Sequence, residues 1–473
     1  MAGKLSISFY GGVGQVTGSC FLVEAKNSNP STDSTSSLQA GSGSKSSTKI
    51  LIDCGLIQGK RFCESDNLKP FPFNPAEIDA VFVTHAHIDH IGRLPKLVKA
   101  GYRGPIYSTT PTKELSALML GDGLSLLKKD AESCGEEPPY AAVDLEKSIG
   151  QWWGVKYHEE IKIGDMRASF LLAGHILGSA MLDIRAAGKR IVFSGDLGTN
   201  ASLLMPQSDQ VDQVDYLVIE STYGNAEHPV AENGELILER AIEDAAAHRG
   251  TLMIPAFATE RTQDILFLCN KMLAERRVPD MPFFVDSPLA IKVTEIFEKY
   301  HDYFNDEVKA LYMKHPHLFQ FKNLRNTPTA DESRAINNVP PPKVIIAGSG
   351  MMTGGRILHH LRRYLPDPQS SLLIVGYQAA GSIGRRILEG AESVEIFSQP
   401  VPVRAKVIVA QGFSAHADKN RLFDFIKELK YSLKHVFAVH AEPESADALV
   451  QAVRDRLGIP ADAPKIGDRF ELD

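Results

Sequence analysis

The stretch that decides the fold is VTHAHIDH, residues 83–90. The run before it, IDAVFVT at 78–84, is rich in Val, Ile and Phe and is typical of a buried β-strand. The run after it, IGRLPKLVKAG, predicts the start of a helix, so the polar cluster lies at a strand-to-helix turn. Its side chains are the ligand types of a borderline-soft divalent metal, zinc first: His85, His87, Asp89 and His90. Without a metal they would place costly polar groups beside a core strand, so the motif favours a metallohydrolase.

Composition places the chain among soluble globular proteins of two or three domains. It has 473 residues, of which 43% are hydrophobic and 23% are charged. The opening MAGKLSISFYGG lacks a signal peptide's apolar segment, and no stretch approaches the roughly 18 apolar residues of a membrane span. The five cysteines form no CxxC pair, which suits a reducing compartment and argues against a cysteine-built zinc site. We therefore expect a cytoplasmic protein without a membrane partner; its oligomeric state is not readable, and a homodimer is left open.

The net charge of −7 argues against a protein that coats nucleic acid non-specifically, but it allows a local basic groove. Between Lys343 and Leu388 the chain carries six Lys or Arg residues against one acidic residue, Asp367. This local excess of +5 predicts a surface that faces phosphates, with an ordinary solvated face as the alternative.

Two textures alternate along the chain. The first third has short strand-like runs and Gly-rich turns, interrupted at 27–48 by a stretch with nine serines in 22 residues. That stretch predicts a disordered extension of a hairpin loop, because it offers too little apolar surface to order itself. From about residue 225, helical patterns alternate with near-continuous apolar strands, which indicates a doubly wound α/β unit. The strand-then-ligand style then returns, which predicts a metal-binding domain interrupted by a second domain, with the active cleft between them.

Three later segments offer further metal ligands at the ends of predicted strands. His175 lies in AGHILGSA, Asp196 ends the run RIVFSGD, and His416 lies in GFSAHAD. Together with the first cluster they give seven nitrogen or oxygen ligands and no thiolate. Seven are too many for one tetrahedral ion, but they fit two ions that share a bridging hydroxide.

The chain resembles the β-CASP branch of the metallo-β-lactamase-fold superfamily, the nucleases that include the polyadenylation-cleavage endonuclease subunit and the RNase J enzymes. The motifs that carry the resemblance are, in chain order, THAHIDH, AGHILGSA, FSGD, IESTYG, IPAFATERTQ, VDSPLA, GSGMMTGG, GYQAAGS and GFSAHAD. Each later motif is weak alone, but their joint order over nearly the whole chain is specific. The resemblance implies a metallo-β-lactamase αββα sandwich, residues 1–224 and 381–473, with an inserted doubly wound α/β (β-CASP) domain at 225–380.

The resemblance also implies a ligand set for two zinc ions. The first ion would be held by His85, His87 and His175, and the second by Asp89, His90 and His416, with Asp196 bridging. Glu220 matches the family's acidic motif A and His416 its motif C. A histidine at motif C is similar to the members that act on RNA.

One position departs from the family pattern. Members of the polyadenylation type carry a motif B histidine in the segment that aligns with GSIGRRIL, and here the candidate position is Arg386. Arginine stabilises phosphate charge but does not readily give up a proton. Either Arg386 clamps the phosphate or pairs with Glu220, or the enzyme is slow or acts on another ester; His359 and His360 are weaker candidates for the proton donor.

The predicted function is a zinc-dependent ribonuclease that hydrolyses single-stranded RNA by a two-metal, bridging-hydroxide mechanism, with endonuclease and 5′-exonuclease action both open. Catalysis is assigned to Asp89, Asp196, Glu220 and Arg386. Substrate binding is assigned to Arg261, Ser349, Gly350, Gly354, Gly355, His360 and Arg386, the glycines belonging to a turn that offers N–H groups to a phosphate or is simply tight. The rivals are a small-molecule thioesterase or lactonase on the same fold and a catalytically weak RNA-binding relative. The short run after His416 favours a minimal nuclease.

Overall fold

The computed structural model describes residues 4–26, 47–58, 66–199, 202–227, 234–376, 378, 381–410 and 415–473. The chain divides into two compact units. Unit 1 comprises residues 1–200, 207–227 and 416–473, and unit 2 comprises 201–206 and 228–415. The Ser-rich stretch predicted to be a disordered loop lies outside the described residues up to 46, whereas Ser47 and Thr48 already belong to a strand.

Unit 1 is built on two seven-stranded sheets. The first runs in the order β22 (Arg469–Leu472), β1 (Lys4–Gly11), β2 (Cys20–Lys26), β3 (Ser47–Ile52), β4 (Ala80–Phe82), β5 (Ile106–Thr109) and β6 (Trp152–Val155). The second runs in the order β21 (Ala461–Asp462), β20 (His435–Val439), β11 (Tyr216–Glu220), β10 (Lys189–Phe193), β9 (Ala180–Ala186), β8 (Met166–Leu172) and β7 (Ile161–Ile163). Lys26 pairs with Ser47 across β2 and β3, which confirms the predicted hairpin on either side of the Ser-rich stretch.

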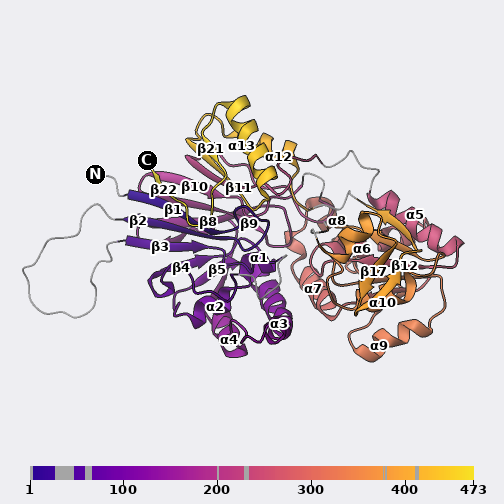
Figure 1. Ribbon diagram of the computed structural model, residues 1–473. Coiled ribbons are helices and arrows are strands. Elements are labelled where there is room, and N and C mark those ends of the chain that lie inside the picture. Colours follow the sequence, from indigo (N-terminus) through magenta and orange to yellow (C-terminus); the bar gives the residue numbers. More distant parts are fainter. Residues whose placement is uncertain are drawn as a thin grey trace, which may run out of the picture. The chain divides into compact units, whose positions relative to one another are not determined.

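Side-chain alternation along the strands creates three apolar layers in unit 1. Between the sheets lie the rings of Phe9, Phe21, Phe82, Phe170 and Phe193, all at most 4% exposed. The opposite faces are covered by helices, as Figure 1 shows. The helices of unit 1 are α1 (Ile88–Ile91), α2 (Leu94–Lys99), α3 (Thr110–Ser133) and α4 (Ala142–Gly150) on the first sheet, and α12 (Lys419–Glu428) and α13 (Pro443–Leu457) on the second. This is the predicted αββα sandwich.

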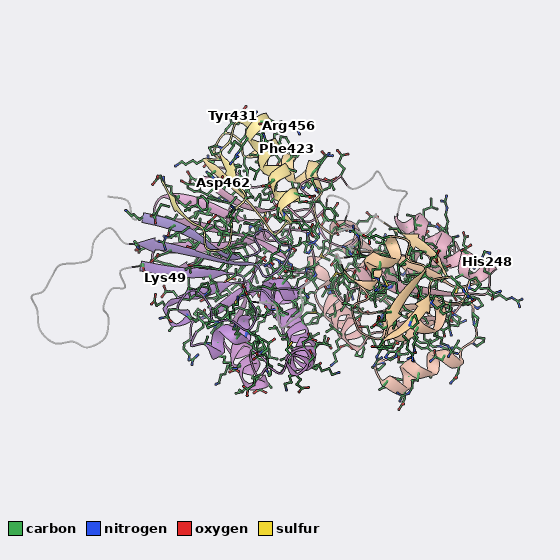
Figure 2. All side chains as sticks on the ribbon, in the orientation of Figure 1. Lys49, His248, Phe423, Tyr431, Arg456 and Asp462 are labelled. Atoms are coloured by element: carbon green, nitrogen blue, oxygen red, sulfur yellow. The ribbon has the colours of Figure 1, made fainter. Side chains whose placement is uncertain are left out.

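The surface of the α12–α13 layer carries both charged and aromatic side chains. The Arg456 guanidinium lies 3.9 Å from the centre of the Phe423 ring, and the Tyr431 side chain is 91% exposed (Figure 2). In the described part of the chain, no helix has the length and apolar character needed to cross a membrane.

Unit 2 contains a six-stranded parallel sheet, as its near-continuous apolar strands predict. Its order is β14 (Leu324–Asn326), β13 (Phe283–Asp286), β15 (Lys343–Ala347), β12 (Thr251–Pro255), β16 (Ser371–Ile374) and β19 (Lys406–Val409). Its helices are α5 (Gly234–Ala247), α6 (Arg261–Ala274), α7 (Pro288–Lys299), α8 (Asp306–Lys314), α9 (Ala330–Ala335), α10 (Ile357–Tyr364) and α11 (Ile383–Leu388), and a hairpin is formed by β17 (Ser393–Ile396) and β18 (Gln399–Pro402).

The second unit extends further along the chain than the predicted end at 380. Residues 381–415 lie in unit 2. The physical reason is strand pairing: β19 adds to the open edge of β16, from Ser371–Lys406 to Ile374–Val409, and so completes the parallel sheet. Sequence patterns do not reveal which sheet a short apolar strand joins.

Candidate metal centre

The VTHAHIDH stretch forms the strand-to-helix turn that its sequence predicts. Strand β4 ends at Phe82, and helix α1 begins at Ile88 with His87 as its N-cap residue. This turn places His85 and His90 in the interior, 0% and 2% exposed. His175 follows β8, Asp196 follows β10 and His416 precedes α12, so all seven predicted ligands belong to unit 1.

The first candidate ligand group joins His85, His87, His175 and Asp196, each offering one atom within 4.8 Å of the others. His85 Nε2 lies 3.0 Å from His87 Nδ1, and His175 Nε2 lies 3.3 Å from the same atom. Two ligands of a tetrahedral zinc ion, each about 2.0–2.1 Å from the metal, are roughly 3.3 Å apart. The spacing of this group therefore suits a single small cation.

The second candidate group contains a residue that the sequence analysis did not single out. Asp89 and His90 gather with His440, which follows strand β20. His440 Nε2 lies 3.6 Å from Asp89 Oδ2 and 3.7 Å from Asp196 Oδ1. The available signal was a histidine directly after the apolar run HVFAV, the same strand-then-ligand pattern as at the other sites.

The backbone of His440 adds a structural signature to this assignment. Its φ of 53° is left-handed, which is uncommon for a residue with a side chain. Its N–H donates to Gly12 O at 2.6 Å, and this bond holds the unusual conformation. Strained backbone of this kind is typical of functional positions.

Asp196 faces both groups with different oxygens. Its Oδ2 lies 3.4 Å from His85 Nε2 and 3.6 Å from His175 Nε2. Its Oδ1 lies 3.4 Å from His90 Nε2. This arrangement is the one expected of a carboxylate that bridges two cations, as the sequence predicted for Asp196.

His416 lies beside Glu220 and not with the Asp89–His90 pair, where it was expected. Its Nδ1 is 3.1 Å from Glu220 Oε1 and 3.3 Å from Oε2, whereas Asp196 Oδ2 is 3.9 Å away. The reason is backbone pairing. His416 forms a β-bridge with Gly198, next to the end of β10, and the position near His90 is occupied by His440, which follows β20. The predicted alternative in which Glu220 pairs with Arg386 is replaced by this Glu220–His416 pair.

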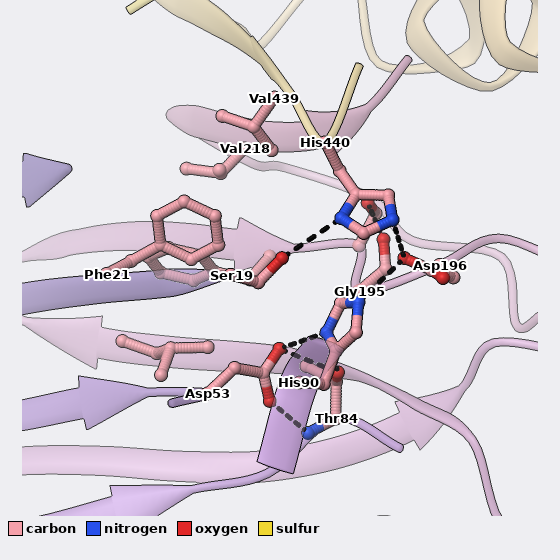
Figure 3. Close-up of a pocket in the computed structure, with 13 residues that line it drawn as sticks. Ser19, Phe21, Asp53, Thr84, His90, Gly195, Asp196, Val218, Val439 and His440 are labelled. Carbon is pink, nitrogen blue, oxygen red and sulfur yellow. Dashed lines mark hydrogen bonds and ion pairs between the residues drawn. The ribbon is translucent and has the colours of Figure 1, made fainter. Parts of the chain in front are cut away.

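Hydrogen bonds behind the ligands fix the orientation of two imidazoles (Figure 3). Asp53 Oδ2 lies 2.7 Å from His90 Nδ1, and Ser19 Oγ lies 3.0 Å from His440 Nδ1. Thr84 donates from both N and Oγ1 to the Asp53 carboxylate, at 2.8 and 2.9 Å. Such partners hold the second ring nitrogen and aim the first at a metal.

Two orphaned atoms test whether the residues fit a cation. Among the described residues, His90 Nε2 and Asp196 Oδ1 are buried and have no hydrogen-bond partner. Buried polar atoms in proteins are nearly always satisfied, so these two indicate a missing partner with positive charge. The donor set around these atoms therefore fits a bound divalent ion.

The electrostatics favour the ligand forms of three histidines and of Asp196, whereas burial raises the pKa of the Asp89 carboxyl. Burial, helped by the neighbouring imidazoles, holds the pKa values of His87, His90 and His175 well below their usual range. Burial opposes the ionisation of Asp196, but the adjacent rings, His440 foremost, lower the pKa of its carboxyl well below the usual value. Neutral imidazoles and an ionised carboxylate are what a metal requires.

The remaining predicted substrate-binding residues lie in unit 2 and stay predictions. Arg261 pairs with Asp264 at the start of α6, and Arg386 is exposed on α11. The turn 348–355 precedes α10; Ser349 Oγ accepts from Gly354 N at 3.3 Å, and Gly355 has φ +74° with no room for a Cβ beside Gly348 O. These contacts support the tight-turn interpretation of the glycines. At Gly350 a Cβ would collide with the Phe257 ring, so this position also lacks room for a side chain.

Comparison with known families agrees with this architecture and site. The metallo-β-lactamase superfamily matches residues 44–226, the β-CASP domain matches residues 262–387, and the Zn-dependent metallo-hydrolase RNA specificity domain matches residues 400–464. The two-sheet sandwich with its gathered histidines thus defines a metal-dependent hydrolase.

Similar proteins make the assignment narrower. Ribonuclease TTHA0252 of Thermus thermophilus is 38% identical over 85% of this chain and 89% of its own length. An RNase J-like protein of Methanocaldococcus jannaschii is 31% identical over 98% of both chains, and the transcription termination factor FttA of Methanosarcina mazei is 30% identical over 96% of this chain and 69% of its own. The chain belongs to the β-CASP ribonuclease family of metallo-β-lactamase-fold hydrolases, a class of hydrolytic nucleases, as the sequence motifs predicted.

A solved structure from Enterococcus faecalis V583, a protein of unknown function, shares the fold. It aligns with a TM-score of 0.56 and 12% identity, covering 99% of this chain and 100% of the other.

Proposed function

We propose that this protein is a zinc-dependent ribonuclease that hydrolyses phosphodiester bonds of single-stranded RNA and binds two metal ions per chain. The observation that carries the proposal is the position of Asp196, whose two carboxylate oxygens face two different groups of histidine ligands. One group is His85, His87 and His175, and the other is Asp89, His90 and His440. Nitrogen and oxygen ligands without thiolate suit zinc, and the His-rich composition favours it over Mg²⁺.

Zinc bound at such a site supplies Lewis-acid polarisation of a phosphoryl oxygen and lowers the pKa of water near it. The protein's own contribution is to hold the ligands rigidly: Asp53, Thr84 and Ser19 fix the second-group histidines before any substrate arrives. This preorganisation reduces the cost of arranging the site during reaction. Asp89 and Asp196 remain the proposed groups that orient the attacking oxygen.

His416 is the proposed proton donor to the leaving oxygen, with Glu220 as its positioning partner. Burial opposes a charged ring at this position, but the carboxylates of Glu220, Asp196 and Asp89, Glu220 foremost, together outweigh it and raise the pKa of His416 to about 9. A ring that is protonated at neutral pH is the form a general acid needs. This assignment takes the place of the weaker donor candidates His359 and His360, since the arginine at position 386 is poorly suited to release a proton.

Glu220 is itself held by the backbone and does not depend on His416 for its position. Its side chain is 0% exposed and accepts a hydrogen bond from Leu197 N at 2.8 Å, and Glu220 is the last residue of β11. The pair is therefore built into the sandwich, on the same strand ends as the metal ligands.

The test is metal analysis combined with mapping of product ends. The purified protein should carry close to two zinc ions per chain, and it should cleave a labelled single-stranded RNA more readily than the matching duplex. RNAs with 5′-monophosphate and 5′-triphosphate ends distinguish 5′-exonuclease from endonuclease action. Hydrolysis of acyl-thioesters or lactones without RNA cleavage would instead support the small-molecule hydrolase, and RNA binding without cleavage would support the catalytically weak relative.

A further inference from the structure

A hollow on the surface of unit 2, here called the basic pocket, has a composition that the hydrolytic site does not explain. It has a volume of about 530 Å³, within the range of ligand-binding clefts. It lies between α9 and α10 and is lined by four arginines and two histidines, with no acidic residue among its lining: Arg334, Arg356, Arg362, Arg363, His359 and His360. In a chain of net charge −7, such a concentration of cations is unexpected.

These six basic side chains do not all carry free charge. Arg356 and His360 are bound to the buried Asp286, at 2.7 Å each, and so belong to the framework of the unit. Arg334 pairs with Asp331 on the surface, where both side chains are more than two-thirds exposed and the pair is weak. Arg362 and Arg363 make no ion pair with an acidic side chain within the described part of the chain. They are the uncompensated charges of the basic pocket.

An aromatic ring stands at the border of the basic pocket. Phe397 is 47% exposed, and its ring centre lies 4.8 Å from that of His359. The Arg362 guanidinium lies 5.4 Å from the centre of the Phe397 ring. The Arg363 guanidinium lies 5.7 Å from the centre of the Tyr364 ring. Arginines beside exposed or half-exposed aromatic faces are typical of surfaces that bind the backbone and stacked bases of single-stranded nucleic acid.

The conformation of Phe397 supports a functional reason for its place. Phe397 and Ser398 form the two-residue turn between β17 and β18, and both have positive φ, 52° and 58°. Such turns strongly favour Asn-Gly, and a bulky aromatic residue there is strained. A strained residue that displays an apolar ring to solvent beside Arg362 indicates a role in binding and not in stability.

His359 completes the environment without adding charge. Partial desolvation, and after it the neighbouring Arg362, lower its pKa. Its neutral ring can donate one hydrogen bond to a phosphate oxygen.

We infer that the basic pocket is a second RNA-binding site, in which Arg362 and Arg363 contact backbone phosphates and Phe397 stacks on a base. The inference rests on the proposed function, since it assigns this pocket to a segment of the same class of substrate that lies outside the hydrolytic site. The combination of free arginines and an exposed ring favours a nucleic-acid strand over an acidic peptide, which needs no stacking surface.

The test measures binding of a fluorescent phosphorothioate RNA of roughly 20 nucleotides, longer than a typical single-strand site, to the full-length protein. The variants are Arg362→Gln/Arg363→Gln and Phe397→Ala, and the matched control is Lys314→Gln/Lys322→Gln. The control removes the same charge from exposed positions of unit 2 away from the basic pocket. We expect the arginine variant to bind at least about tenfold more weakly, and to reduce the slope of log affinity against log salt by about 1.4, two phosphates at roughly 0.7 each.

Phe397→Ala should weaken binding by roughly fivefold to a hundredfold, the range for one stacked base. A second variant, Phe397→Asn, suits the turn and should raise the midpoint of thermal unfolding while weakening binding equally, which separates loss of stacking from loss of fold. The control should bind within about twofold of the wild type, as expected for charges outside the site.

The outcomes separate this inference from the proposed function. Wild-type protein that neither binds nor cleaves RNA refutes the proposed function. Wild-type protein that does both, with the pocket variants indistinguishable from the control, refutes only the second site. Equal dependence of AMP binding on Arg362, Arg363 and Phe397 would show a mononucleotide site, and loss of acidic-peptide binding with RNA binding unchanged would show a protein site; either result overturns the inference.

Discussion

The Glu220–His416 pair makes a prediction that can be worked out from the structure. Replacing Glu220 by Gln removes the largest of the negative charges that raise the pKa of His416, while the amide oxygen can still accept from Leu197 N. In the wild type the pKa is about 9, compared with an ordinary value of 6.5. This raised pKa corresponds to a net preference for the protonated ring of about 3 kcal/mol.

The sign of the pH effect follows from the role of the protonated ring. A group with a raised pKa keeps its proton below that pKa and loses it as the pH rises through it. At pH 8 about 90% of His416 is protonated in the wild type, at a pKa of about 9. Each unit by which loss of the Glu220 charge lowers this pKa below 8 reduces the protonated fraction at pH 8 about tenfold, so RNA cleavage by Glu220→Gln should fall at alkaline pH and approach the wild-type rate at acidic pH.

The assay is a pH profile of kcat/KM for cleavage of a labelled RNA between pH 5 and 10. The wild-type profile should fall at its alkaline end near pH 9, and the Glu220→Gln profile should fall at a lower pH. Glu227→Gln is the matched control, because Glu227 is an exposed carboxylate on the same segment that pairs with Lys419. An alkaline limb that stays in place in Glu220→Gln would refute the assignment of His416 as the proton donor.

Further predictions concern the metal site and the framework of unit 2. His440→Ala should lower the bound zinc from about two ions to about one per chain by elemental analysis, and two retained ions would show that His440 is not a ligand. Ser19→Ala should weaken binding of the second ion roughly 10- to 100-fold in chelator competition, because it frees the His440 ring; unchanged affinity would contradict this orienting role. The Asp286 carboxylate is hydrogen-bonded by His360, Ser333, Arg356 and Thr327. Burial raises its pKa, but these partners outweigh burial and lower the pKa to about 2. The ionised carboxylate should therefore stabilise the fold by about 2 kcal/mol above pH 4, and this stabilisation should be lost between about pH 4 and 2. Urea unfolding of wild type and Asp286→Asn should differ by that free energy at pH 6 and converge near pH 2, and a constant difference would exclude titration of Asp286 as the cause.

Much of the fold was predictable because local patterns carry it. The apolar runs at 78–84 and 343–347 have the composition of buried strands, and both form strands as expected. The change to alternating strands and helices after residue 225 predicted the parallel sheet of unit 2. The end of that unit was placed too early because β19 is a short strand whose partner, β16, is chosen by packing and not by its own residues.

The sequence by itself determined the metal-binding class of this protein. His85, His87, Asp89 and His90 lie within six residues, so one turn suffices to bring them together, and no distant contact is needed to recognise the cluster. Ordered motifs along the chain added the family. A metal-binding cluster can be recognised from sequence when its ligands are neighbours along the chain.

Tertiary structure was needed to place the two distant histidines. His416 and His440 each follow an apolar run and lie 24 positions apart, so the sequence offers no way to rank them as neighbours of the Asp89–His90 pair. Parallel pairing of β20 with β11 carries His440 to Asp89 and Asp196, whereas the bridge to Gly198 leaves His416 against Glu220. Strand register is set by the buried faces of both sheets together, which is why the neighbours of these two histidines emerge only once the sandwich is assembled.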